Sequence, residues 1–184
     1  DDIIIKEPKL LYLVEKDKNL IKILKQKYKN NKKIIIIEDD ILNFNLKKFY
    51  NLIVISNLPY NISTKIILYL FNFNKNISEM VLMLQKEVAI KFDYNLKKMN
   101  KYKFITRVLS DYSRCFDVSK NVFIPVPKVK STVVKFNFNR KEVDLIKVNK
   151  FSNLIFKNVR KKISNNININ KNNFLLDKRI NQLS

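Results

Sequence analysis

Several residue types are missing from this 184-residue sequence, which contains no glycine, no histidine, no tryptophan and a single cysteine, Cys115. Without glycine, no Gly-rich loop can bind a phosphate or a cofactor, so tight turns must be made by Asn, Asp, Ser or Pro. One cysteine excludes an intramolecular disulfide and a cysteine-cluster zinc site. We therefore expect a cytoplasmic protein without a structural metal, in which Cys115 is a small core residue.

Long hydrophobic runs are also absent. No segment reaches the roughly 18 uninterrupted apolar residues that a membrane-spanning helix needs, and we find no signal peptide. Hydrophobic residues still make up 46% of the sequence, which is enough for one α/β domain with a small appendage. The sequence therefore predicts a soluble protein, expected to be a monomer, with no membrane partner.

Positive charge is abundant: 37 Lys and Arg against 16 Asp and Glu give a formal net charge of +21. Clustered lysines neutralise phosphates and release counterions, so this charge favours a polyanionic partner such as RNA, DNA or anionic lipid. The sequence is also rich in Lys, Asn and Ile, as an AT-rich coding bias would make it, and this bias accounts for part of the charge. We favour nucleic-acid binding, although charge alone does not identify the substrate.

Buried strands alternate with helices in the first part of the sequence, which is typical of a mostly parallel α/β sheet. We predict strands at residues 10–14, 34–37, 52–55 and 80–84, and helices at residues 19–28, 65–73, 85–94 and 103–113. Ser63 is the expected N-cap of the second helix.

Two further strands are predicted at residues 116–118 and 132–138, and the second alternates apolar and polar residues as an antiparallel edge strand does. Two prolines between these strands predict an extended loop that exposes Phe123 and Lys128. From residue 140 the sequence is basic and helical, with helices expected at 145–163 and 177–183. We therefore predict an α/β domain at residues 1–139 and a small helical lobe at residues 140–184.

The stretch Asn57-Leu58-Pro59-Tyr60 lies between a predicted strand and a predicted helix, where open α/β sheets bind ligands. An adenine amine is a poor nucleophile, and two acceptors aimed at its protons would localise its lone pair. Asn57 offers a side-chain carbonyl, and Pro59 has no N–H, which leaves the carbonyls of the turn free to face a pocket. The ring of Tyr60 could stack on a base that has left its helix, worth about 1–3 kcal/mol. On its own, the motif is equally typical of a plain turn.

Acidic residues follow the two preceding strands. Glu15 ends the first, and Asp39 and Asp40 follow the second. A carboxylate at such a position commonly accepts both hydroxyls of a ribose, and Asp40 could accept from an adenine amino group. Taken singly, each is more typical of a solvated strand end or a helix cap. Their expected convergence with Asn57 at one edge of the sheet is the stronger signal, and it would place Asn57 between a cofactor and the target.

Five segments resemble, in order, the motifs of the small-subunit ribosomal RNA adenine dimethyltransferase family: LVEKD at 13–17, EDDILNF at 38–44, NLPYNIST at 57–64, MLQKEV at 83–88 and FIPVPKV at 123–129. Residues 156–165 and 179–184 resemble its C-terminal lobe. The resemblance implies a Rossmann-like class I methyltransferase sheet, mostly parallel with an antiparallel edge. It also implies S-adenosylmethionine as the methyl donor. The implied target is two adjacent adenosines near the 3′ end of small-subunit rRNA, each methylated twice, in RNA or in an immature small ribosomal subunit.

By position, the resemblance implies that Glu15 binds the ribose of the cofactor, that Asp40 and Ile41 hold its adenine, and that Asn57 contacts its methionine end and the target amine. Leu58 and Pro59 would offer backbone carbonyls to that amine, while Tyr60 and Phe123 would enclose the base. The implied phosphate contacts are Lys128, Lys130, Arg160 and Lys161. For these four residues, a solvated basic face is an equally good interpretation.

The family begins with a helical segment, a first strand and a Gly-rich loop, whereas this sequence starts with Asp and has no glycine. We therefore expect an incomplete chain, lacking the first strand, that binds S-adenosylmethionine weakly or not at all and is inactive by itself. A natural lineage that lost the loop is the alternative. Two other functions stay open: a non-catalytic RNA-binding ribosome assembly factor, and a relative of large-subunit rRNA adenine methyltransferases or mitochondrial transcription factors.

Overall fold

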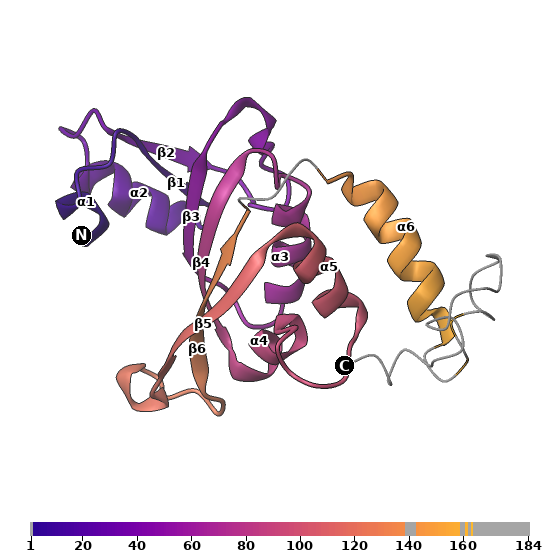
Figure 1. Ribbon diagram of the computed structural model, residues 1–184. Helices are drawn as coiled ribbons and strands as arrows, with labels where there is room; N and C mark the ends of the chain where they lie inside the picture. The colour runs from indigo at the N-terminus through magenta and orange to yellow at the C-terminus, as the bar shows by residue number, and fades with distance from the viewer. Residues whose placement is uncertain (1, 139–142, 159–160, 162, 164–184) are drawn as a thin grey trace. The chain divides into compact units, whose positions relative to one another are not determined.

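The computed structural model describes residues 2–138, 143–158, 161 and 163 (Figure 1). The chain forms two compact units, Asp1–Leu46 and Lys47–Ser184. Among the described residues, each unit has its own sheet, of two strands in the first and four in the second. The two are therefore described separately.

The first unit contains a parallel pair of strands with one long helix. Its elements are α1 (Asp2–Ile5), β1 (Leu11–Glu15), α2 (Lys18–Lys27) and β2 (Ile34–Glu38). The strands pair from Leu11 opposite Ile34 to Glu15 opposite Glu38. Asp17 caps α2: its Oδ1 accepts hydrogen bonds from the backbone N–H groups of Asn19 at 2.7 Å and Leu20 at 3.1 Å. Because β1 and β2 run in the same direction, both end at one edge, and the helix begins beside it.

The second unit contains a mixed sheet in the order β3-β4-β6-β5 (Figure 1). Its strands are β3 (Leu52–Asn57), β4 (Ile77–Gln85), β5 (Asp111–Val118) and β6 (Ser131–Asn137). Strands β3 and β4 are parallel, and β6 is antiparallel to both β4 and β5. The prediction that β6 is the edge strand is wrong, because β5 takes that place. The alternation along β6 reflects one covered face of the sheet rather than a free edge.

Helices of the second unit are α3 (Ser63–Phe71), α4 (Lys86–Phe92), α5 (Lys101–Leu109) and α6 (Leu145–Ile155), with short 3-10 turns η2 (Lys120–Val122) and η3 (Phe156–Asn158). The 3-10 turn η1 (Leu46–Lys48) spans the boundary between the two units. The predicted helix 103–113 ends at Leu109, and the residues from Asp111 belong to β5. Ser63 is not an N-cap: Ile62 holds that position, and the Ser63 hydroxyl donates to the Tyr60 carbonyl at 3.3 Å.

The core of this unit is aromatic and lies where α3 and α4 pack on the sheet. Phe71 of α3, Phe92 of α4 and Phe136 of β6 are fully buried, and their ring centroids lie 5.6 to 6.2 Å apart in edge-to-face contacts. Such packing fixes the strands relative to the helices that connect them. The residues at the strand ends are therefore held on a rigid base.

Helix α6 packs against α5. The ring of Phe104 on α5 lies 5.9 Å from Phe151 and 6.0 Å from Phe156, and Lys101 donates to the Asn153 side chain at 2.6 Å. The α-helix predicted for residues 145–163 ends at Ile155 and continues as η3. The helix predicted at 177–183 lies outside the described residues, and the domain boundary at 139/140 stays a prediction.

Cys115 is exposed, so its assignment to the core was wrong. It lies on the outer strand β5, where the pairing with β6 shifts register between Arg114 and Phe116. A bulge on an edge strand turns side chains out of the regular alternation. Within the described ranges, no helix combines the length and the apolar character that crossing a membrane requires.

Candidate functional site

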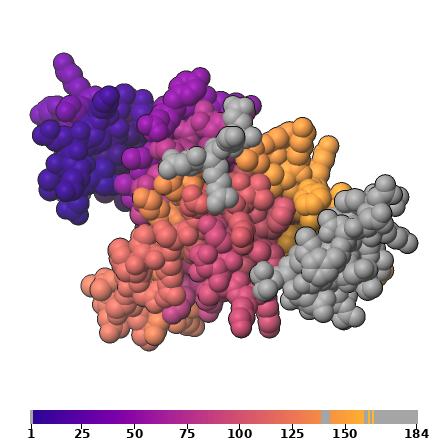
Figure 2. All heavy atoms as spheres, viewed as in Figure 1, coloured from indigo at the N-terminus to yellow at the C-terminus, as the bar shows by residue number. Residues whose placement is uncertain are grey.

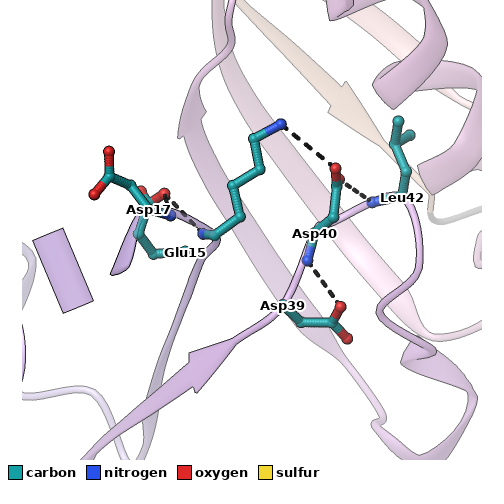
Figure 3. Close-up of polar contacts among 6 residues, drawn as sticks. Glu15, Asp17, Asp39, Asp40 and Leu42 are labelled. Carbon is teal, nitrogen blue, oxygen red and sulfur yellow. Dashed lines mark hydrogen bonds and ion pairs between the residues drawn. The ribbon is translucent and has the colours of Figure 1, made fainter. Parts of the chain in front are cut away.

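Carboxylates gather where β1 and β2 end (Figure 3). Oε1 of Glu15 accepts hydrogen bonds from the N–H groups of Lys16 at 2.8 Å and Asp17 at 2.9 Å. Oδ1 of Asp39 accepts from the N–H of Asp40 at 2.8 Å. We call Glu15, Asp39 and Asp40 the acidic edge. Each carboxylate is oriented by backbone groups one or two residues further along the chain.

Asp40 is held by two further contacts. Its Oδ1 accepts from the N–H of Leu42 at 2.9 Å, and its Oδ2 forms an ion pair with Nζ of Lys16 at 3.5 Å (Figure 3). The N–H of Asp39 donates to the carbonyl of Glu15 at 3.0 Å, which joins the two strand ends. The structure thus brings the predicted residues Glu15 and Asp40 to one edge, with Ile41 in the turn that follows.

The Asn57-Leu58-Pro59-Tyr60 turn leaves the carboxyl end of β3. Asn57 is the last residue of the strand, opposite Met83, and is exposed. The N–H of Leu58 donates to the Met83 carbonyl at 3.2 Å, and its side chain is 4% exposed. The turn is therefore anchored by Leu58, while Asn57 and Pro59 face solvent. The Pro59 carbonyl accepts from the N–H of Ile62 at 3.3 Å, and its second lone pair can accept one more donor.

Tyr60 is tied to a distant part of the sheet. Its hydroxyl and the hydroxyl of Ser131 are hydrogen-bonded at 2.8 Å, across 71 residues of sequence. Ser131 is the first residue of β6, paired with Gln85 of β4 on one side and Val118 of β5 on the other. Nothing in the sequence spacing indicates this contact, and Ser131 was not among the predicted site residues.

The loop from residue 119 to residue 130 begins and ends at the same edge of the sheet as the turn. It leaves β5 at Val118 and enters β6 at Ser131, opposite the last residue of β4. In Figure 2 the loop is part of the salmon-coloured lobe that projects from the unit. Phe123 in this loop is half-buried, and Lys128 and Lys130 are exposed. The structure therefore brings these three predicted residues to the edge that carries Asn57 and Tyr60, which we call the turn-and-loop edge.

An ion-pair cluster lies at the base of this loop. Asp117 of β5 pairs with Arg114 and, at 3.3 Å, with Nζ of Lys86. The hydrogen bond from Arg114 is the main reason that the pKa of Asp117 is lowered to about 2. The N–H of Lys86 also donates to the Lys130 carbonyl at 3.0 Å. These contacts fasten both ends of the loop to the start of α4, and no pattern in the sequence indicates them.

The two remaining predicted phosphate contacts are set apart from this edge in the sequence. Arg160 lies outside the described residues. Lys161 is exposed and follows η3, where its N–H donates to the Asn158 carbonyl at 3.0 Å.

A profile of the family described as "Ribosomal RNA adenine dimethylase" matches residues 2–183. The chain belongs to this family. The family that the motifs of the sequence predict is therefore confirmed, and so is the α/β class of the fold.

Several curated relatives of this chain are named "Ribosomal RNA small subunit methyltransferase A". The protein from Malacoplasma penetrans is 39% identical over 175 residues, which cover 90% of this chain and 62% of that protein. The protein from Mycoplasmopsis synoviae is 37% identical, over 92% of this chain and 67% of that one. The chain thus spans less than two thirds of the length of the Malacoplasma protein.

Solved structures show the same fold. A dimethyladenosine transferase from Plasmodium falciparum superimposes with a TM-score of 0.73 at 22% identity, over 88% of this chain and 60% of that one. The 23S rRNA methyltransferase ErmE superimposes with a TM-score of 0.73 at 17% identity, over 96% of this chain and 80% of that one. The predicted Rossmann-like class I methyltransferase fold is confirmed.

Proposed function

We propose that this chain takes part in transferring methyl groups from S-adenosylmethionine to the exocyclic amines of two adjacent adenosines near the 3′ end of small-subunit rRNA. The observation that carries this proposal is the turn of Asn57, Leu58, Pro59 and Tyr60 at the end of β3. Its backbone is fixed to β4 and its tyrosine to β6. Such a turn presents several acceptors and one ring in a fixed arrangement, as methylation of a flipped base requires.

The acidic edge fits the adenosine part of S-adenosylmethionine. Oε1 of Glu15 accepts hydrogen bonds from the backbone of its own turn. In this proposal Oε2 accepts the ribose hydroxyls. Asp40, with Ile41 beside it, suits the adenine and its amino group. When bound, the donor supplies a methyl group on a positively charged sulfur, which leaves as a neutral thioether.

At the turn-and-loop edge, the side-chain carbonyl of Asn57 and the backbone carbonyls of Leu58 and Pro59 would accept hydrogen bonds from the target amine. These acceptors draw the nitrogen toward tetrahedral geometry and stabilise the positive charge that develops on it. No side chain has to act as a strong base, because the nitrogen carries a positive charge once the methyl group has been transferred and releases its proton to water. The chemistry therefore suits a chain without histidine.

The remaining predicted residues suit the RNA. Tyr60 and Phe123 would enclose the base, and Lys128 and Lys130 would contact phosphates from the exposed loop. Arg160 and Lys161 are further candidates for contacts with phosphates. The natural partner in this proposal is an immature small ribosomal subunit in the cytoplasm, bound by a monomer.

The test is incubation of the natural gene product that carries these residues with radiolabelled donor and purified ribosomal particles. We expect label in the rRNA of immature small subunits. Binding to those subunits without incorporated label would contradict the enzyme and support a non-catalytic assembly factor. Label confined to large-subunit rRNA would contradict the proposed substrate.

The affinity of residues 1–184 alone for S-adenosylmethionine is a separate prediction. Because these residues contain no glycine-rich loop for the methionine moiety, we expect weak or undetectable binding in titration calorimetry. Micromolar binding would contradict this expectation.

A further inference from the structure

Tyr60 is restrained at two points, its backbone carbonyl and its ring hydroxyl. On the backbone side, its carbonyl accepts from the Ser63 hydroxyl at 3.3 Å, which ties the turn to the first residue of α3. On the ring side, its hydroxyl is bonded to the Ser131 hydroxyl at 2.8 Å. Stacking on a base needs the ring alone. The hydroxyl of Tyr60 is therefore available for a separate purpose, which is to hold the ring in place.

Ser131 is a rigid anchor for that hydroxyl. It is fully buried, as is the next residue, Thr132. Its strand is hydrogen-bonded on both sides, to β4 and to β5, so Ser131 cannot move without disturbing the pairing of β6 with both neighbours. A buried hydroxyl without a partner costs free energy. The buried Ser131 hydroxyl therefore favours the state in which it is bonded to Tyr60 and the ring is fixed.

We propose that Ser131 is a positioning residue, which fixes the ring of Tyr60 in the orientation that stacks on the target adenine. Ser131 also ends the loop that carries Phe123, so one residue links the two aromatic sides of the base site. Fixing a ring before the base arrives reduces the conformational entropy lost on binding. The inference rests on the proposed function for the identity of the base.

The first test measures base stacking without any methyl donor. The probe is a single-stranded RNA oligonucleotide in which 2-aminopurine replaces one of two adjacent adenosines, and its fluorescence reports stacking. We expect Ser131→Ala to weaken binding of this probe about threefold to tenfold, the effect of one lost hydrogen bond. Tyr60→Ala should abolish the change in fluorescence.

The matched control is Ser78→Ala. Ser78 lies at the opposite end of the same sheet, in β4, where its hydroxyl donates to the Leu52 carbonyl at 3.1 Å. Its substitution removes a similar hydrogen bond and should lower the melting temperature by a similar amount, yet leave probe binding unchanged. A general loss of stability would affect both variants alike.

A double-mutant cycle and ring dynamics test the mechanism itself. If the Tyr60–Ser131 hydrogen bond is responsible, Tyr60→Phe, Ser131→Ala and the double variant should weaken probe binding to a similar extent. In NMR spectra of protein with labelled tyrosine, the Tyr60 ring should flip faster in Ser131→Ala than in the wild type. Additive effects, or an unchanged flip rate, would overturn the inference.

The outcomes separate this inference from the proposed function. Equal probe affinity of the Ser131→Ala and Ser78→Ala variants overturns the inference, as does a wild type whose probe signal does not depend on Tyr60. A Ser131-dependent probe signal in a protein that transfers no methyl group supports the inference while the proposed function fails. Methyl transfer whose KM for RNA is unchanged by Ser131→Ala overturns the inference alone.

Discussion

Residues 1–46 carry ten lysines against eight acidic residues, whereas residues 47–184 carry 27 Lys and Arg against eight acidic residues. Three acidic residues of the first unit form the acidic edge, while the turn-and-loop edge of the second unit has exposed lysines and a half-buried tyrosine and phenylalanine. Carboxylates suit the hydroxyl and amino donors of a small nucleoside, and lysines with aromatic rings suit RNA. The difference in charge therefore fits the proposal that the first unit binds the methyl donor and the second unit binds the RNA.

The two edges also differ in how their side chains are held. The carboxylates of Glu15 and Asp39 accept from backbone groups one or two residues away. Tyr60, by contrast, is held by Ser131, 71 residues further along the chain. The acidic edge is therefore held mostly by contacts within one or two residues, and the Lys16–Asp40 ion pair and the Asp39–Glu15 backbone bond each span 24 residues. The turn-and-loop edge depends on the complete packing of its sheet. Substitutions in the second unit should accordingly affect site residues that are far away in the sequence.

Asn57→Ala is the change with the largest expected effect. Loss of the side-chain acceptor should lower kcat for methyl transfer about 100- to 1000-fold, with RNA binding retained. The measurement is single-turnover methyl transfer at saturating donor and RNA.

The control for this change is Asn72→Ala. Asn72 caps the other end of α3, where its amide donates to the carbonyls of Leu68 and Tyr69. Activity should stay near that of the wild type. A normal kcat for Asn57→Ala would contradict the role of the Asn57 side chain as an acceptor for the target amine.

Glu15→Gln should affect the donor alone. The glutamine carbonyl can still accept from the backbone of the turn, but its amide presents donors where Oε2 would accept from the ribose. We expect donor affinity to fall about tenfold and RNA affinity to stay unchanged, as measured by calorimetry and filter binding. Glu7→Gln, an exposed residue of the same unit, should change neither. A loss of RNA binding in Glu15→Gln would contradict the division between the two edges.

The pair Lys128→Ala and Lys130→Ala should affect RNA alone. We expect RNA binding to weaken about fivefold and the salt dependence of log K to become shallower by about 1 to 2. The control pair is Lys48→Ala and Lys75→Ala, which precede β3 and β4 and so lie at the opposite end of the sheet. If both pairs had the same effect, the loop would be one part of a general basic surface.

The smallest expected effect concerns Asp117, whose pKa is lowered to about 2, first of all by its hydrogen bond to Arg114. The unfolded-state pKa is about 3.9, so Asp117 stabilises the fold fully above about pH 4, and this stabilisation is lost as the pH falls toward 2. Because the residue is exposed, the change should be small. Melting temperatures from pH 2 to 7 should show a shallower acid limb for Asp117→Asn. Glu87→Gln, exposed on α4, should keep the wild-type limb.

The sequence was sufficient for the local parts of this structure. The strand ends at Glu15 and Asn57 and the acidic turn at Asp40 follow from runs of apolar residues and their polar ends, which are local patterns. The place of β6 inside the sheet was missed, because its alternation reports a covered face and not the neighbours of the strand. The bond between Tyr60 and Ser131 was missed for a related reason: it exists only once β4, β5 and β6 have paired.

The most direct test of the account is nucleoside analysis by mass spectrometry after small-subunit rRNA has been incubated with the natural protein and isotope-labelled donor. We predict label on the exocyclic nitrogen of adenosine, as dimethyladenosine at two adjacent positions, and its loss in Asn57→Ala. Label on a ring nitrogen, on a ribose or on another base would contradict the role of the turn as an acceptor for an adenine amine. Bound RNA that acquires no label would contradict methyl transfer itself.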